Sequence, residues 1–385
     1  MSQEAFGDIP LFRELQKLLS GSSGPINMEI AGQVGVAVAK QGFVDPPRDR
    51  DLERAYADAV HSAEQVLSGY TRLPLAQPME VTGFGRGSWV RSTLEAWRWL
   101  LEHLARRFSE EFGKFADGDE EAAPLNAAFG QMAPLLFGIQ AGSLVGQLAR
   151  ESLARYDLPI PRRDDGDLFL VAPNVRQIIK DYEFDTDQFL QWLALREVGR
   201  HLLMQSVSWL PRYTKNLLVA LVDTIELDVG DFERRLMELQ TKGIEALQEG
   251  LDTEDRIPLV DSVQHHQAQE RLHALIAVVE GYATHSFEAV AQQMSLDDSR
   301  IREAMVRRHA SPTEGERALA GVLGIQIDRD LATSGATFCA AVTKLKGLQE
   351  LNRVWDAADN LPTLAEIKDP FAWMERLAEH SEESL

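Results

Sequence analysis

The chain of 385 residues carries 39 lysines and arginines against 60 aspartates and glutamates, which gives a formal net charge of −21. Hydrophobic residues make up 44% of it and charged residues 26%, proportions that are typical of a folded globular protein and exclude wholesale disorder. A surface with this excess of carboxylates repels phosphate, so we expect neither nucleic acid nor an anionic membrane as a partner.

The use of cysteine and the start of the chain indicate where the protein works. Cys339 is the only cysteine, which excludes a disulfide framework, and its small apolar surroundings predict a buried structural thiol. Residues 1–10 lack the basic head and apolar stretch of a signal peptide. The longest apolar segment, residues 135–149, is too short to span a bilayer. We therefore expect a cytoplasmic protein.

Helical periodicity extends over most of the chain. Ser92 and Glu95 match a capping box, which predicts the start of a helix at that point. Gly138, Gly142 and Gly146 repeat every four residues, so they give one side of a helix a smooth ridge. The pattern predicts that another backbone packs closely on this ridge.

The second half of the chain continues the helical pattern after one strand. Residues 168–171 are the only convincing short strand. Further helices are expected to begin near Asp187, near Leu217 and near Asp261, the last of them reaching Ala291. The predicted fold class is therefore mainly α with a few short strands.

None of the turn-rich breaks in the sequence resembles a flexible interdomain linker longer than a dozen residues. The simplest division gives an N-terminal helical lobe, residues 1–160, and a C-terminal lobe, residues 161–385. One continuous domain is equally compatible with the pattern.

The helix expected from Asp187 carries charges on an otherwise apolar surface. Residues 188–210 read QFLQWLALREVGRHLLMQSVSWL, which is typical of a helix buried on several sides. Arg196 and Arg200 are four residues apart and share a face, with Glu197 beside them. Unpaired charges on a buried stripe are costly, so these groups should pair internally or line a cavity.

A partner for these arginines is expected on the helix that ends near Ala291. Glu280 interrupts an apolar stripe on that helix, where a leucine would be expected. A buried Arg–Glu cluster between the two helices would explain both irregularities. Two interpretations stay open: an ion network that only fixes the register of the helices, or a functional pocket.

The spacing R-E-x-x-R resembles H-E-x-x-H, in which two histidines hold zinc and the glutamate activates water. Other segments strengthen this resemblance: GPINMEIAGQVG, RGSWVRSTLEAWRWL, LFLVAPNV, WLALREVGRHLL, VVEGYATH, IREAMVRRHA and LNRVWDAADNLPTLAEIKDPFAWMERL. Over most of its length the chain is similar to the zincin-like metallopeptidase family of bacteria, whose members were long described as a domain of unknown function or as hydrolases. The resemblance implies a zincin-like helical core around residues 187–291.

Typical members of this family carry H-E-V-T-H, with the glutamate of an EGYAD motif as the third zinc ligand. The resemblance therefore places Arg196 and Arg200 at the two histidine positions, Glu197 at the general-base position and Glu280 at the third-ligand position. Thr284 stands where related zinc peptidases have an acidic residue that orients a histidine. Arginine stays protonated and cannot bind zinc, so we expect no metal and no other cofactor here, although typical members hold zinc.

Two histidines border the predicted site. His201 lies one residue beyond the second histidine position, which rotates it by about 100° around the helix, so we expect a packed or hydrogen-bonded side chain. His285 follows the EGYAT segment and borders the former pocket. Outside the site, Arg302, Arg307, Arg308 and His309 form a dense basic patch that we expect to pair with the excess carboxylates.

These observations favour a non-catalytic homologue of a zincin-like metallopeptidase. Its Arg–Glu network would replace the metal, and its cleft would bind a peptide, a protein or a small acidic ligand through Arg196 and Arg200. One alternative is an active hydrolase that uses Glu197 as its base with an atypical metal arrangement or none. Another is an accessory protein linked to deazaflavin cofactor metabolism, which one branch of the family implies. Whether the chain is an enzyme is left open by the sequence.

Overall fold

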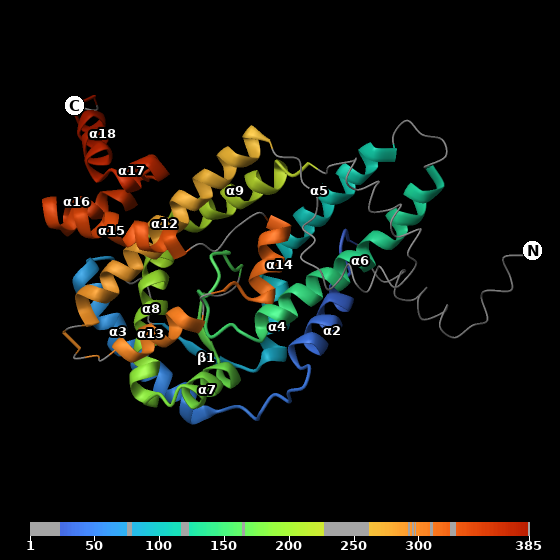
Figure 1. Ribbon diagram of the computed structural model, residues 1–385, viewed down its shortest axis with the longest axis horizontal. Coiled ribbons are helices and arrows are strands. Elements are labelled where there is room, and N and C mark those ends of the chain that lie inside the picture. The colour runs from blue at the N-terminus through green and yellow to red at the C-terminus, as the bar shows by residue number, and fades with distance from the viewer. Residues whose placement is uncertain are drawn as a thin grey trace, which may run out of the picture.

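The computed structural model describes residues 24–74, 79–116, 123–163, 166–226, 262–291, 293–294, 296, 298–308, 311–323 and 329–383. In chain order the first half contains α2 (Met28–Ala39), α3 (Arg50–Thr71), β1 (Val81–Phe84), α4 (Arg86–Ala96), α5 (Arg98–Ala116), α6 (Ala123–Ala149), β2 (Leu168–Val171), α7 (Ala172–Asp181) and α8 (Thr186–Ser206). The second half contains α9 (Leu210–Asp223), α12 (Val263–Ala291), α13 (Ser299–Arg308), α14 (Glu314–Leu323), α15 (Arg329–Lys346), α16 (Leu348–Asn352), α17 (Leu364–Lys368) and α18 (Pro370–Glu383). Helices dominate the view in Figure 1, so the prediction of a mainly α fold is confirmed.

The glycine ridge of α6 packs against α2, as predicted. A Cβ atom at Gly142 would lie 2.5 Å from the carbonyl oxygen of Ala31, and one at Gly138 would lie 2.5 Å from that of Asn27. The contact is reciprocal, because a Cβ at Gly35 of α2 would lie 2.9 Å from the carbonyl oxygen of Gly142. The two backbones therefore touch along this face, and Figure 1 shows the helices side by side.

Helix α6 also contains the longest apolar stretch of the described chain. Met132–Ala149 is, within the residues that the structure describes, the one helical segment long and apolar enough to cross a membrane by length and composition. The expectation drawn from residues 135–149 therefore understated the length of this stretch. Half of it is buried inside the fold, where α6 contacts α2, α4 and α5, as in the core helix of a globular protein.

The two strands pair in parallel, with Val81 opposite Leu168 and Phe84 opposite Val171. β2 lies where the sequence predicted a strand, and all four of its residues are buried. β1 was not predicted, because its four residues, VTGF, are only half-buried and include a glycine.

The predicted capping box is wrong. Ser92 and Glu95 lie inside α4, which begins after Gly85, and the chain turns into α5 at Trp97. The Ser92 hydroxyl accepts a hydrogen bond from the Arg162 guanidinium at 2.7 Å, so this side chain joins two segments of the fold and caps no helix.

The later helices begin close to their predicted positions, with one exception. α8 begins at Thr186 and α12 at Val263. α9 begins at Leu210, well before Leu217, because Pro211 stands in its first turn, where a proline is compatible with a helix.

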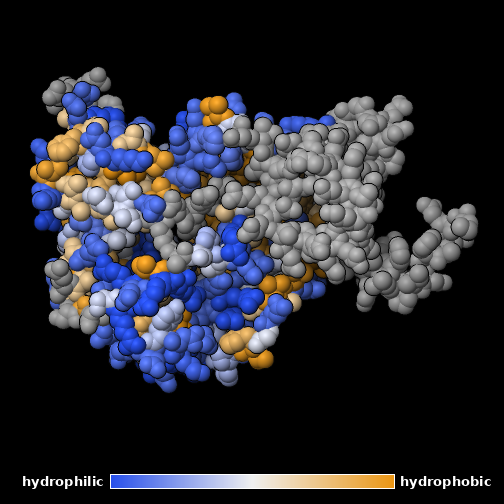
Figure 2. All heavy atoms as spheres, in the orientation of Figure 1, coloured by the Kyte–Doolittle hydropathy of each residue, from blue (hydrophilic) through white to orange (hydrophobic). Residues whose placement is uncertain are grey.

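Two hydrophobic clusters form the core of the described residues. One gathers side chains from α4, α5, α6 and α9, and the other gathers side chains from α3, α7 and β2. α8 and α12 contribute to both, with Leu203 and Leu272 in the first cluster and Leu190 and Phe287 in the second. Hydrophilic side chains cover much of the described surface in Figure 2. The division into lobes at residue 160 stays a prediction.

Candidate functional site

The candidate site lies where α8 and α12 cross. A Cβ atom at Gly199 of α8 would lie 3.5 Å from the Cβ of Ala283 on α12, which is ordinary van der Waals contact. On another side of α12, Gly281 meets Gly335 of α15 so closely that a Cβ at Gly281 would lie 2.2 Å from the Gly335 carbonyl carbon. Glu280, next in the chain to Gly281, is therefore held at a fixed place beside α8.

Arg200 and Glu280 form a two-point ion pair across this crossing. Arg200 Nε donates to Glu280 Oε1 at 2.7 Å, and Arg200 Nη2 donates to Glu280 Oε2. Arg200 Nη1 donates to the carbonyl oxygen of Arg196, one turn earlier, at 2.8 Å. The Arg200 residue is 6% exposed, so the pair is shielded from water on the α8 side.

Both members of this pair are charged. Burial by itself would lower the pKa of the Arg200 guanidinium, but the Glu280 carboxylate outweighs burial and raises that pKa above its ordinary value. Burial would likewise raise the pKa of Glu280, and the charge and hydrogen bonds of Arg200 overcome it and lower that pKa. Of the Arg–Glu cluster predicted between the two helices, Arg200 and Glu280 are therefore in direct contact.

Glu197 faces a different neighbour. Its Oε2 accepts a hydrogen bond from the backbone N–H of Tyr156 at 2.8 Å, and the residue is 2% exposed. Burial, followed by the nearby Asp157 carboxylate, raises the pKa of Glu197 to about 8, against the opposing effects of Arg200 and the Tyr156 amide. A carboxyl group with this pKa is mostly protonated at neutral pH.

The segment around Tyr156 is positioned by β2. Ala154 forms an antiparallel bridge with Leu170, and Val171 donates a backbone hydrogen bond to the Leu153 carbonyl at 2.7 Å. Asp157 Oδ2 closes the turn by accepting the N–H groups of Leu153 and Ala154, the latter at 3.0 Å. This closed turn fixes the direction of the amide that reaches Glu197.

His201 is buried and hydrogen-bonded, as expected. The Tyr156 hydroxyl lies 2.9 Å from His201 Nδ1, and the two rings meet nearly edge to face with centroids 5.9 Å apart. Burial and the charge of Arg155 lower the pKa of His201 to about 4, so the imidazole is neutral at pH 7.

Arg196 does not share the pairing of Arg200. Its guanidinium lies over the Trp192 ring, 4.8 Å from the centroid, and its side chain makes no ion pair or hydrogen bond with another described residue. Burial and repulsion by Arg200 lower the pKa of Arg196 to about 10. The expectation that the arginines pair internally is therefore met by a direct ion pair for Arg200 alone, whereas the carboxylates of Glu280, Asp157 and Glu197 attract Arg196 without direct contact.

Tyr56 is a member of the cluster that the sequence did not indicate. It comes from α3, which packs on α8, and its hydroxyl is fully buried without a hydrogen-bond partner among the described residues. Burial, then the charges of Glu197 and Asp157, raise the pKa of Tyr56 well above its ordinary value. Within the apolar stripe of α3 a tyrosine has the same pattern as an ordinary core residue, so no sequence signal could have identified it.

Thr284 and His285 stay outside the Arg–Glu cluster. The Nε2 atom of His285 lies 3.2 Å from the Tyr70 hydroxyl and 3.1 Å from the Thr343 hydroxyl, which directs this ring toward α3 and α15. Burial lowers the pKa of His285. Thr284 is half-buried, and its side chain makes no hydrogen bond within the described part of the chain.

The residues at this site do not fit a zinc ion. A guanidinium offers no lone pair to a metal, and both carboxylate oxygens of Glu280 already accept from Arg200. No three His, Cys, Asp or Glu side chains of the described residues gather closely enough to hold a metal ion.

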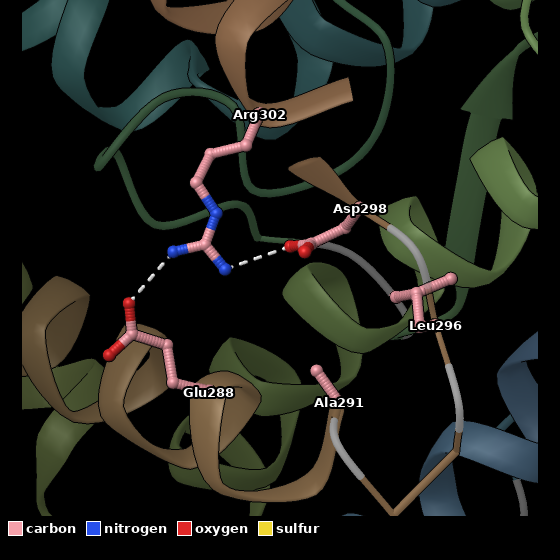
Figure 3. Close-up of a pocket in the computed structure, with 5 residues that line it drawn as sticks. All are labelled: Glu288, Ala291, Leu296, Asp298 and Arg302. Carbon is pink, nitrogen blue, oxygen red and sulfur yellow. Dashed lines mark hydrogen bonds and ion pairs between the residues drawn. The ribbon is translucent and has the colours of Figure 1, made fainter. Parts of the chain in front are cut away.

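Two members of the basic patch near residue 302 pair with carboxylates, as predicted, and Arg308 does not pair with any in the described part of the chain. Arg302 bridges Glu288 at 3.0 Å and Asp298 at 2.9 Å, beside a hollow of 320 Å³ in Figure 3. Arg307 pairs with Glu303 at 3.1 Å, and Arg308 donates to a backbone carbonyl. His309 lies outside the described residues.

A family model described as zincin-like metallopeptidase matches residues 26–374, and the chain belongs to that family. A solved structure with a similar fold is titled "Crystal structure of a putative hydrolase with a novel fold from Chloroflexus aurantiacus". It has a TM-score of 0.62 and 21% sequence identity, and the match covers 92% of this chain and 99% of that chain. No protein of curated function matches the sequence.

Proposed function

We propose that this chain is a metal-independent, non-catalytic member of the zincin-like metallopeptidase family. The observation that supports this most directly is the two-point contact of Arg200 with Glu280, which occupies both oxygens at the third-ligand position. The guanidinium supplies positive charge where typical members hold zinc, and it keeps that charge at any physiological pH. The negative charge of Glu280 is then compensated without a metal ion.

Arg196 is the group of this site that remains for a ligand. Its guanidinium makes no direct ion pair with a carboxylate of the described residues, and Trp192 supports one side of it. A carboxylate or another anionic group forms strong charge-assisted hydrogen bonds with a guanidinium. We therefore propose that the protein works in the cytoplasm by binding a peptide, a protein or a small ligand with an acidic group at Arg196.

Metal content tests the first part of this proposal. Protein purified without chelator and without a metal-affinity tag is analysed by elemental mass spectrometry, before and after incubation with zinc and removal of unbound metal. We expect no stoichiometric zinc in either sample. Zinc near one equivalent per chain would overturn the proposal.

The role of Arg196 needs a separate test with a defined probe. A fluorescently labelled peptide of six glutamates is titrated into the protein, with a peptide of six glutamines as the matched control. We expect only the acidic peptide to bind, and Arg196→Gln to weaken its binding. Equal binding of the acidic peptide to wild-type protein and Arg196→Gln would exclude Arg196 as the contact.

One observation favours a hydrolase as the second candidate. Burial and Asp157 raise the pKa of Glu197 to about 8, in the range where a carboxyl group exchanges protons near neutral pH. A hydrolase predicts turnover of peptide or ester substrates that is lost in Glu197→Gln while the fold is kept. We rank it second because Glu197 is 2% exposed and its Oε2 already accepts the Tyr156 amide. The link to deazaflavin cofactor metabolism stays a prediction from the family resemblance.

A further inference from the structure

A second hollow, of 480 Å³, lies between α5 and α9 and shares no residue with the Arg–Glu cluster. Its lining includes four cationic side chains, Arg98, Arg106, Arg163 and Lys215, against two carboxylates, Glu95 and Glu102. In a chain with a net charge of −21, an excess of positive charge around one hollow is unusual and indicates an anionic partner.

The two carboxylates of the hollow are already engaged. Glu95 pairs with Arg98 at 2.7 Å, and Glu102 lies 3.8 Å from Arg98 and 3.9 Å from Arg106. Arg163 and Lys215, by contrast, form no ion pair with any residue that the structure describes. These two cations are therefore the ones available to a ligand.

Arg163 is held in place by its neighbour in the chain. Arg162 donates to the Thr93 hydroxyl at 2.8 Å and to the Ser92 hydroxyl at 2.7 Å, and the Arg163 backbone N–H donates to the Ala96 carbonyl at 3.1 Å. These contacts tie the segment to the end of α4. The backbone from which the Arg163 side chain extends is therefore ordered before a ligand arrives.

Trp99 supplies an aromatic surface in the same hollow. Lys215 Nζ lies 5.1 Å from the centroid of the Trp99 ring, and Val219 adds an apolar side chain from the next turn of α9. The ring of a ligand can pack on the Trp99 indole. The anionic group of that ligand then lies within reach of the Lys215 ammonium, which faces the indole ring.

We propose that this hollow binds a small ligand in which an anionic group, a phosphate or a carboxylate, is attached to a flat ring. The anionic group pairs with Arg163 and Lys215, and the ring packs against Trp99. The volume of 480 Å³ lies within the range of small-molecule sites, roughly 300–1,000 Å³.

Isothermal titration with four simple probes tests the proposal. Phenyl phosphate and benzoate carry both features, inorganic phosphate carries only the charge, and phenol carries only the ring. We expect phenyl phosphate or benzoate to bind roughly tenfold more tightly than either single-feature probe, and to bind more weakly at high salt. The tighter of the two identifies the anionic group. Binding of phenol as tight as that of phenyl phosphate and benzoate, or no binding of any probe at millimolar concentration, would overturn the proposal.

Substitutions locate the binding in this hollow. Lys215→Gln and Arg163→Gln should each weaken the binding of the tighter probe by roughly tenfold, because each removes one charge-assisted contact. Lys180→Gln on α7 and Arg307→Gln on α13 are matched controls outside the hollow and should leave the affinity unchanged. Trp99→Leu should weaken the ring-bearing probes and leave inorganic phosphate unaffected. Equal losses in the control variants would show that the binding reflects charge alone, without a site.

Discussion

The guanidinium of Arg200 and the carboxylate of Glu280 lie side by side across the contact of α8 with α12, with Arg200 Nε 2.7 Å from Glu280 Oε1. Each residue interrupts an apolar surface of its own helix, and each compensates the charge of the other. The contact therefore explains how two charged groups can lie within the contact between these two helices. The same contact also determines how much stability the protein should lose when one of the two charges is removed.

Glu280→Gln should destabilise the protein by about 3–5 kcal/mol, because it leaves the guanidinium of Arg200 buried without a counter-charge. The change in the free energy of unfolding is measured by urea denaturation. Glu288→Gln is the matched control, since Glu288 pairs with Arg302 at the surface, where both side chains are about half exposed, and this loss should stay below about 1 kcal/mol. Equal losses in the two variants would mean that the Arg200–Glu280 pair is open to water.

A double substitution distinguishes the net contribution of the ion pair from the cost of leaving one buried charge unpaired. Arg200→Met combined with Glu280→Leu should be much less destabilising than Glu280→Gln alone, because neither charge is then left buried and unpaired. The same urea denaturation measures it. The single variants Arg200→Met and Glu280→Leu are measured in the same way. If the stability lost by the double variant equals the sum of the losses of these two single variants, the two side chains do not interact.

The pH dependence of stability should reveal Glu197 and His201 together. The pKa of Glu197 is raised from 4.5 to about 8, so unfolding releases its proton in this window, and rising pH favours unfolding. The pKa of His201 is lowered from 6.5 to about 4, so unfolding takes up a proton in that window, and falling pH favours unfolding. The two effects oppose each other between pH 4.5 and 6.5, and only Glu197 acts from pH 6.5 to 8.

Wild-type protein should therefore lose stability between pH 6.5 and 8, by at most about 1.4 kcal/mol per pH unit. Glu197→Gln keeps a neutral side chain at this position at every pH, so the decline should disappear. Unfolding free energies at half-unit pH steps provide the measurement, and His201→Gln should change only the acid side of the profile. A decline of the same slope in Glu197→Gln would mean that another group causes it.

The sequence predicted a buried Arg–Glu cluster between the two helices because charged residues interrupt the apolar periodicity of each helix, which is a signal that a single chain carries. It could not tell which arginine reaches Glu280. Arg196 and Arg200 share a face, but one helical turn separates them by about 6 Å along the axis. The crossing point at Gly199 and Ala283 decides the outcome, and that point depends on the packing of both helices.

Other contributors to the site carry no periodic signal. Tyr156 and Asp157 belong to an irregular turn, and they reach Glu197 because β2 binds the preceding residues. β2 itself was predicted from its buried apolar run, whereas its partner β1, which is equally long, is only half-buried and includes a glycine. The parts of the site that the sequence did not predict are therefore those that tertiary contacts create.

The ridge of α6 provides a prediction independent of the site. Gly142→Ala should destabilise the protein by about 1–3 kcal/mol although alanine favours helices, because the new Cβ would lie 2.5 Å from the Ala31 carbonyl oxygen. Gly130→Ala in the same helix is the control, since nothing lies within 4 Å of its added Cβ, and it should stabilise by up to about 1 kcal/mol. Thermal unfolding distinguishes the two; stabilisation by both would contradict the close contact of α2 with α6.

Restoring the histidines tests whether side chains alone explain the lack of fit to zinc. Arg196→His combined with Arg200→His recreates H-E-x-x-H on α8, with both imidazoles on one face, and it frees Glu280 from Arg200 as a third oxygen ligand. The double variant should bind about one zinc ion per chain, measured by elemental mass spectrometry after dialysis, whereas wild-type protein should bind none.

The matched control for this experiment is Arg196→Gln combined with Arg200→Gln, which removes the same charges without adding ligands and should stay free of zinc. Binding of zinc by the histidine variant alone would mean that the distance between α8 and α12 still suits a metal, held by residues 196, 200 and 280. A folded histidine variant without zinc would show instead that the close contact of Gly199 with Ala283 no longer leaves the ligands the tetrahedral arrangement that zinc requires.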